Sequence, residues 1–101
     1  MSAKAVWTPD AESDLEEIVY YISVKEGRPA VAEQVAHSLK AECDRRAVAP
    51  HAAERETRLG PECRRFTFKR WVVLYRPWRE GIAVLRIVDG SRDFDRVFGI
   101  T

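Results

Sequence analysis

The sequence has few of the side chains that build metal centres and hydrolytic active sites. It contains only two cysteines, Cys43 and Cys63, and two histidines, His37 and His51. The cysteines are too few for a disulfide framework and lack the spacing of metal ligands. The sequence shows no histidine that would pair with Ser91 as a base, and neither cysteine neighbours an obvious base. We therefore expect a reduced domain that holds no metal and no other cofactor, and the sequence identifies no catalytic residue.

Long apolar runs are also absent. No segment approaches the ~18 consecutive apolar residues that a membrane-spanning helix requires. The opening Met1-Ser2-Ala3-Lys4 leads into no apolar segment of the kind found in secretory signals. The sequence therefore predicts a cytoplasmic protein with no membrane partner.

Neither sign of charge is in excess. The 101 residues include 17 Lys and Arg against 16 Asp and Glu, which leaves a net charge of +1. This total argues against a protein that binds nucleic acid through positive charge over its whole surface. With 46% apolar and 33% charged residues, the composition is that of a folded protein. The length suits a single domain over residues 1–101.

The first half of the chain has the pattern of two helices. Thr8 can cap the first helix, Pro9 suits its first position, and Gly27 is a suitable stop. A second helix is predicted from Pro29 to Pro50, and the short link implies an antiparallel hairpin. Apolar residues recur at helical spacing in both, at Leu15, Ile18, Val19 and Ile22 and then at Val31, Val35, Leu39 and Cys43.

The second half has the turn signals and apolar alternation of strands. Strands are predicted over residues 65–69, 71–76 and 82–88, with a further candidate over residues 3–7. Residues 50–63 are expected to form a loop, and Pro77 is expected to end the central strand. The predicted fold class is therefore α+β, with an N-terminal helical hairpin packed on a small antiparallel β-sheet.

The near-neutral total hides an uneven distribution of charge. Residues 1–63 carry a net charge of −4 and residues 64–101 a net charge of +5. Eight of the nine basic residues in the second part are arginines, whose planar guanidinium suits phosphates and carboxylates. They are Arg64, Arg65, Arg70, Arg76, Arg79, Arg86, Arg92 and Arg96. The cluster indicates a surface for a polyanion or an acidic partner, and the alternative is that single arginines pair with nearby acids such as Asp89 or Asp93.

Two of these arginines lie at the end of a strand face that is otherwise apolar. By strict alternation, Arg76 shares a face with Leu74, and Arg86 shares one with Val84 and Val88. An arginine in such a place must reach water, pair with an acid or serve a site. These arginines are therefore candidates for a functional surface.

The carboxylates of the first helix are expected to have no catalytic role. Asp14, Glu16 and Glu17 fit the solvated face of that helix. If the protein does any chemistry, its residues suggest only phosphodiester cleavage supported by arginines. Arginine titrates far above neutral pH, so it would be a weak general acid or base.

Several segments, taken in order, resemble a known superfamily. They are Trp7-Thr8-Pro9-x-Ala11-x-x-Asp14-Leu15-x-x-Ile18-x-x-Tyr21-Ile22, then Arg65-Phe66, then Val72-Val73-Leu74-Tyr75-Arg76, and finally Gly81-Ile82-x-Val84-Leu85-Arg86-Ile87-Val88-Asp89-Gly90-Ser91-Arg92-Asp93. Over residues 5–95 the chain resembles the RelE/ParE toxins of type II toxin–antitoxin systems, which are also known as plasmid stabilisation modules. The resemblance implies the same fold that periodicity predicts.

The resemblance leaves a choice between two activities. RelE-like members are ribosome-dependent mRNA endonucleases, whereas ParE-like members are understood to poison DNA gyrase. On the RelE pattern, Arg65 and Arg92 match basic positions. Val72, however, stands where a central-strand arginine is expected, and Phe98 stands where a catalytic tyrosine is expected. Phenylalanine cannot transfer a proton, so the resemblance favours the ParE branch.

The sequence-based hypothesis is therefore a ParE-like toxin that inhibits gyrase without a catalytic centre of its own. The resemblance implies a small cognate antitoxin, ParD-like or similar, that neutralises it. The candidate surface for contact with the target, a phosphate or the antitoxin comprises Arg65, Arg76, Arg86 and Arg92. Two alternatives stay open: an endonuclease that acts on the ribosome and its mRNA, and a degenerate, non-toxic module that only binds the antitoxin.

Overall fold

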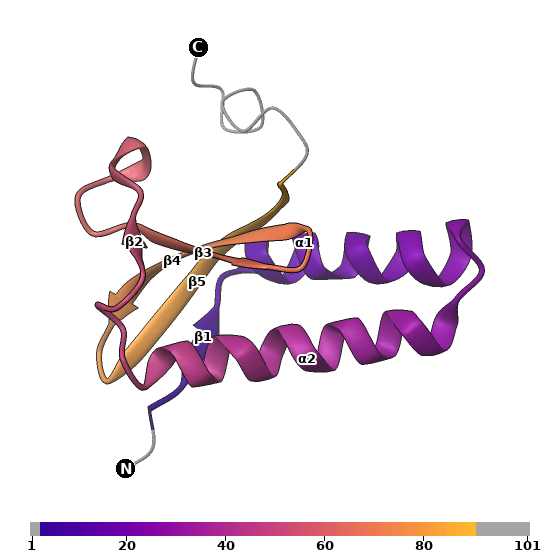
Figure 1. Cartoon of the computed structure of the whole chain (residues 1–101), viewed down its shortest axis with the longest axis horizontal. Helices are drawn as coiled ribbons and strands as arrows, with labels where there is room; N and C mark the ends of the chain where they lie inside the picture. The colour runs from indigo at the N-terminus through magenta and orange to yellow at the C-terminus, as the bar shows by residue number, and fades with distance from the viewer. Residues whose placement is uncertain (1–2, 91–101) are drawn as a thin grey trace.

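The computed structural model describes residues 3–90, and its elements follow the order that the sequence predicts (Figure 1). The helical elements are α1 (Pro9–Tyr20), the π-helical turn η1 (Tyr21–Lys25), α2 (Pro29–Ala47) and the short 3-10 turn η2 (Thr57–Leu59). The strands are β1 (Ala5–Trp7), β2 (Glu54–Arg55), β3 (Arg64–Phe68), β4 (Trp71–Trp78) and β5 (Gly81–Asp89). The α+β class and the helical hairpin are confirmed.

The five strands form one sheet in the order β1-β5-β4-β3-β2. The strands from β2 to β5 pair antiparallel, as predicted. β1 adds itself to β5 in parallel, with Ala5 opposite Ile82 and Trp7 opposite Val84, so the sheet is mixed. Gly81 allows this approach, because a Cβ atom there would lie 1.9 Å from the carbonyl oxygen of Lys4.

The first helix begins as the sequence predicts and ends differently. The backbone N–H of Ala11 donates to the Thr8 hydroxyl at 3.1 Å, and Pro9 occupies the first turn. Regular α-helix stops at Tyr20, where the chain widens into η1 before Gly27 turns it with a φ of +67°. Figure 1 shows α1 and α2 side by side, with their connection projecting away from the sheet.

The core lies between this helical hairpin and one face of the sheet. Apart from Ala53, its buried members come from α1, η1, α2 and the three longest strands, and include Leu15, Ile22, Val35, Leu39, Cys43, Phe66, Val73, Tyr75, Ile82, Val84 and Ile87. α2 ends at Ala47, three residues before the predicted stop at Pro50. A second, smaller cluster contains Cys63, Leu74 and Val88. Because successive strand residues point to opposite faces, β4 is buried on both sides.

A β-bulge changes the faces that alternation predicts for β5. The register places Arg86 opposite Leu74 but Val84 opposite Tyr75, so Leu85 is an extra residue. Val84 accordingly belongs to the larger cluster and Val88 to the smaller one. The prediction that Arg86 shares one face with both is therefore wrong.

Two further expectations are corrected at the sheet margins. β4 continues through Pro77, which pairs with Ile82 of β5. The partners of β3 along β4 end at Tyr75, so no strand on that side requires an N–H from Pro77. Residues 50–63 are not wholly a loop, because they contain β2 and η2.

Candidate functional site

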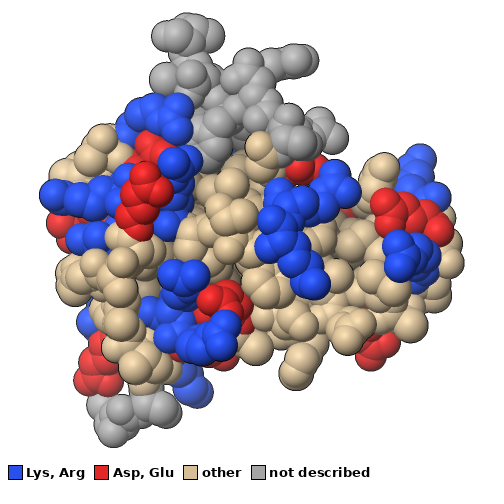
Figure 2. Space-filling view, in the orientation of Figure 1, with Lys and Arg blue, Asp and Glu red and all other residues tan. Residues whose placement is uncertain are grey.

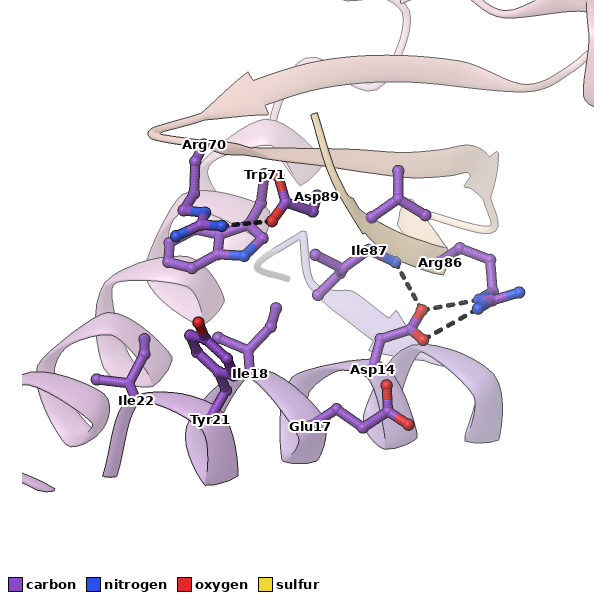
Figure 3. A pocket seen from close by; sticks show the side chains of 11 residues that line it. Asp14, Glu17, Ile18, Tyr21, Ile22, Arg70, Trp71, Arg86, Ile87 and Asp89 are labelled. Atoms are coloured by element: carbon purple, nitrogen blue, oxygen red, sulfur yellow. Dashed lines mark hydrogen bonds and ion pairs between the residues drawn. The ribbon is translucent and has the colours of Figure 1, made fainter. Parts of the chain in front are cut away.

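Arg86 is held by a carboxylate of α1. Its Nε and a terminal nitrogen donate to the two carboxylate oxygens of Asp14 at 2.8 and 3.1 Å (Figure 3). The backbone N–H of Ile87 also donates to Asp14, at 2.8 Å. The hydrogen bond to Asp14 raises the pKa of Arg86. Asp14 therefore belongs to the helix–sheet contact and not, as predicted, to a solvated helix face.

Asp14 is one of the groups that bind the edge of β5 beyond the end of β1. β1 covers β5 only as far as Val84, and α1 then runs along the remaining strand edge. Thr8 takes over first, since its N–H donates to the Val84 carbonyl and its hydroxyl to the Leu85 carbonyl. Asp14 next accepts the N–H of Ile87. The start of α1 thus satisfies backbone groups that an open edge would leave unpaired.

A pocket of about 410 Å³ opens beside this ion pair (Figure 3). It is lined by Asp14, Glu17, Ile18, Tyr21, Ile22, Arg70, Trp71, Arg86, Ile87, Val88 and Asp89. Its apolar surface comes mainly from isoleucines and Trp71, and an Arg70–Asp89 ion pair of 2.6 Å closes one side. Tyr21, at the start of η1, is 52% exposed. The pocket can accept an apolar side chain between charged walls.

Arg65 is engaged by two acids beside β2. Its guanidinium lies 3.6 Å from Glu54 and 3.6 Å from Glu56. Glu56 is itself buried and accepts two hydrogen bonds from the Arg58 guanidinium, at 2.8 and 3.0 Å, which lower its pKa. Arg65 and Arg86 both lie opposite Leu74 in one row across three strands. They do not form a joint site, because Arg65 pairs toward β2 and Arg86 toward α1.

Arg76 differs from both of these arginines. It is exposed near the end of the β4–β5 hairpin, and its guanidinium lies 4.6 Å from the centre of the Trp78 ring. It forms no ion pair with any carboxylate of residues 3–90.

Arg92 and Phe98 lie outside the described residues, so the structure places three of the four predicted arginines. On the face shown in Figure 2, Lys and Arg side chains form separate patches, most of them beside acidic side chains.

The structure also gives roles to residues outside the four candidate arginines. Asp14 has a partner 72 positions away, which no local pattern could indicate. Trp78 and Arg79 join Arg76 at the hairpin end. The Arg76-Pro77-Trp78-Arg79 sequence carried a usable signal here, since i and i+2 share a face of a strand.

Both cysteines and Tyr75 are unfavourably placed to act as nucleophiles or proton donors. Burial raises the pKa of Cys43 to about 12 and also raises the pKa of Cys63, so both thiols are protonated at neutral pH. The buried Tyr75 hydroxyl donates to the Pro50 carbonyl at 2.9 Å, and burial raises its pKa. No three His, Cys, Asp or Glu residues among positions 3–90 lie close enough to hold a metal ion.

Within residues 3–90, no helical element is long and apolar enough to span a membrane.

Comparison with known proteins agrees with this architecture. A solved structure described as a chromosomal ParDE TA system from P. aeruginosa has the same fold, with a TM-score of 0.71 and 24% sequence identity. The alignment covers 86% of this chain and 95% of that chain. No curated protein sequence is significantly similar to the chain. The family described as the ParE toxin of the type II toxin–antitoxin system parDE matches residues 5–94. That range agrees with the one expected from the sequence, and the chain belongs to this family of ParE toxins.

Proposed function

We propose that this toxin acts by binding and poisoning DNA gyrase, and that a small cognate antitoxin of the ParD type neutralises it. The family match over residues 5–94 carries the proposal. The related fold described as a ParDE system supports the pairing with an antitoxin. Stabilisation of a plasmid or chromosomal segment would follow from such a pair.

The proposal assigns the toxin a binding role and no catalytic step. Three observations support this choice. The two cysteines and Tyr75 are buried with raised pKa values. Arg86 is held by Asp14. Val72, at the position where RNA-cleaving relatives are expected to have arginine, packs against the smaller apolar cluster. A surface of this kind can block a partner but offers little general acid–base assistance.

The antitoxin is expected to cover the apolar surface around the pocket. Tyr20, Tyr21 and Val24 are large apolar residues that are 55%, 52% and 58% exposed at the end of α1 and in η1. Tyr21 lines the pocket, whose walls also include Arg70 and Arg86. An amphipathic antitoxin segment with acidic residues beside its apolar ones would complement this surface.

A supercoiling assay tests the proposed target. Purified toxin is added to gyrase, relaxed plasmid and ATP, and we expect supercoiling to fall with toxin concentration. Toxin premixed with its antitoxin is the matched control and should leave supercoiling intact. Unchanged supercoiling at a large excess of folded toxin would contradict the proposal.

Two companion measurements separate the alternatives. Primer extension on translated mRNA should show no new 5′ ends after toxin induction, whereas an endonuclease would create them. Growth after expression without antitoxin should stop. Normal growth would instead indicate a module that only binds antitoxin.

A further inference from the structure

The end of the β4–β5 hairpin carries two arginines on one exposed indole. The guanidinium carbons of Arg76 and Arg79 lie 4.6 and 5.4 Å from the centre of the Trp78 ring, within the range of cation–π contacts. Trp78 is 38% exposed, and both arginines are exposed. β3 does not extend alongside this part of β4, since its partners end at Tyr75. The three side chains therefore project from a part of the sheet that β3 does not border.

These two arginines are distinguished by what they lack. The other described arginines of the sheet half are engaged by protein groups: Arg64 with the Ala53 carbonyl, Arg65 with Glu54 and Glu56, Arg70 with Asp89, and Arg86 with Asp14. Arg76 and Arg79 form no ion pair with a carboxylate of residues 3–90, although Glu80 follows directly in the turn. Among residues 64–90, Arg64 and Lys69 also lack a carboxylate partner, but Arg76 and Arg79 are the two that lie together at one tip.

The geometry suits phosphate groups. Stacking on an aromatic ring restrains a guanidinium while its N–H groups remain available for hydrogen bonds to an anion. Two guanidiniums within 5.4 Å of one ring centre place two charges close together. Phosphates follow one another at ~3.4 Å of rise along each DNA strand. Two neighbouring phosphates therefore present two negative charges that can pair with the two positive guanidiniums. Because the tip presents two guanidinium charges, it is suited to the phosphates of the backbone.

We propose that Arg76 and Arg79, restrained by Trp78, form a contact for the phosphate backbone of duplex DNA. The contact is independent of base sequence and goes beyond the proposed action on gyrase, because it is made by the toxin itself. Lys4 lies beside the tip, where its carbonyl accepts the N–H of Ile82. Glu80 is the opposing charge, and it weakens the attraction for phosphate.

The test measures binding of the full-length toxin to a fluorescently labelled 20-base-pair duplex by anisotropy, from about 20 to 150 mM salt. With two phosphate contacts, the slope of log K against log salt is expected to be about −1.8. R76A and R79A should each weaken binding roughly tenfold at the lowest salt and reduce the slope by about 0.9. E80Q should tighten binding.

The control is R28A, because Arg28 is another exposed arginine without an acidic partner in residues 3–90, and it lies at the far end of the helical hairpin. It removes the same charge and should leave DNA affinity nearly unchanged. W78A keeps both charges but removes their support. It should weaken binding while the melting temperature stays close to that of R76A.

Three results would overturn the proposal. The first is no binding of wild-type toxin at the lowest salt. The second is an equal loss in R28A and R76A, which would indicate a diffuse charge effect. The third is binding of polyglutamate as tight as that of DNA, which would indicate an acidic protein partner. The supercoiling assay with R76A/R79A is scored separately, so a failure of DNA binding leaves the gyrase proposal to its own test.

Discussion

At the scale of single residues, Asp14 has the clearest structural role. It accepts hydrogen bonds from the Arg86 guanidinium and from the Ile87 backbone, and only 12% of its side chain is exposed. D14A removes the carboxylate that binds both the partly buried Arg86 guanidinium and the Ile87 backbone N–H, so we expect a loss of about 2 kcal/mol. D14N retains an oxygen for the Ile87 N–H and should lose about half as much. Urea unfolding followed by circular dichroism measures both.

A double-mutant cycle then decides whether Arg86 is structural. If the pair stabilises the fold, D14A/R86A will lose less stability than the two single variants predict together. Additive losses would contradict the structural assignment of Arg86 and return it to the candidate functional surface.

At the scale of elements, the sequence predicts what local patterns encode. Thr8 and Pro9 mark the start of α1, and alternation and turns locate the three long strands. The bulge at Leu85 gave no signal, because an extra apolar residue looks like its neighbours. The parallel position of β1 depends on an approach to Gly81 far along the chain. Long-range pairing of this kind cannot be read from local periodicity.

The candidate site was predictable to a similar degree. The sequence located the arginines but left open whether Arg76 reaches water, pairs with an acid or serves a site; in the structure Arg76 is exposed, two residues before the end of β4. It could not say that Arg65 and Arg86 are engaged by acids, because those acids lie on β2, just after it and on α1. Ion pairing between elements is a property of the packed fold and not of a segment.

The docking of β1 gives a prediction at this scale. In G81A the new Cβ would meet the Lys4 carbonyl oxygen at 1.9 Å and other Lys4 backbone atoms at 2.9 Å. Backbone cannot move aside as a flexible side chain can, so β1 should separate from β5 at a cost of about 3 kcal/mol. Hydrogen exchange of the Ile82 amide, which donates to Lys4, should become much faster.

The matched control is V6A, which alters β1 at a residue that is 49% exposed without creating a clash. It should change stability by less than about 1 kcal/mol. Equal protection of the Ile82 amide in G81A and wild type would show that β1 docking does not depend on the missing side chain.

At the scale of the whole molecule, part of the opposite charge of the two halves is paired across the fold. Asp14 of the acidic half neutralises Arg86 of the basic half, and Glu54 and Glu56 lie beside Arg65. A net charge of +5 on residues 64–101 therefore overstates the charge available to a partner. Among the described residues, the hairpin tip carries two arginines without a carboxylate partner, Arg76 and Arg79.

The packed core also fixes how stability responds to alkaline pH. Burial raises the pKa of Cys43 from 9.0 to about 12 and raises that of Tyr75. Above about pH 9 the unfolded chain loses the Cys43 proton while the folded chain keeps it, so the unfolded state binds fewer protons and stability falls with rising pH. The thiol alone accounts for a slope of up to ~1.4 kcal/mol per pH unit, between about pH 9 and 12.

Urea midpoints measured in a reducing buffer should be level from pH 7 to 8.5 and decline from pH 9 to 10. C43A should be less stable throughout but decline more gently, whereas an unchanged slope would exclude the buried thiol as the cause.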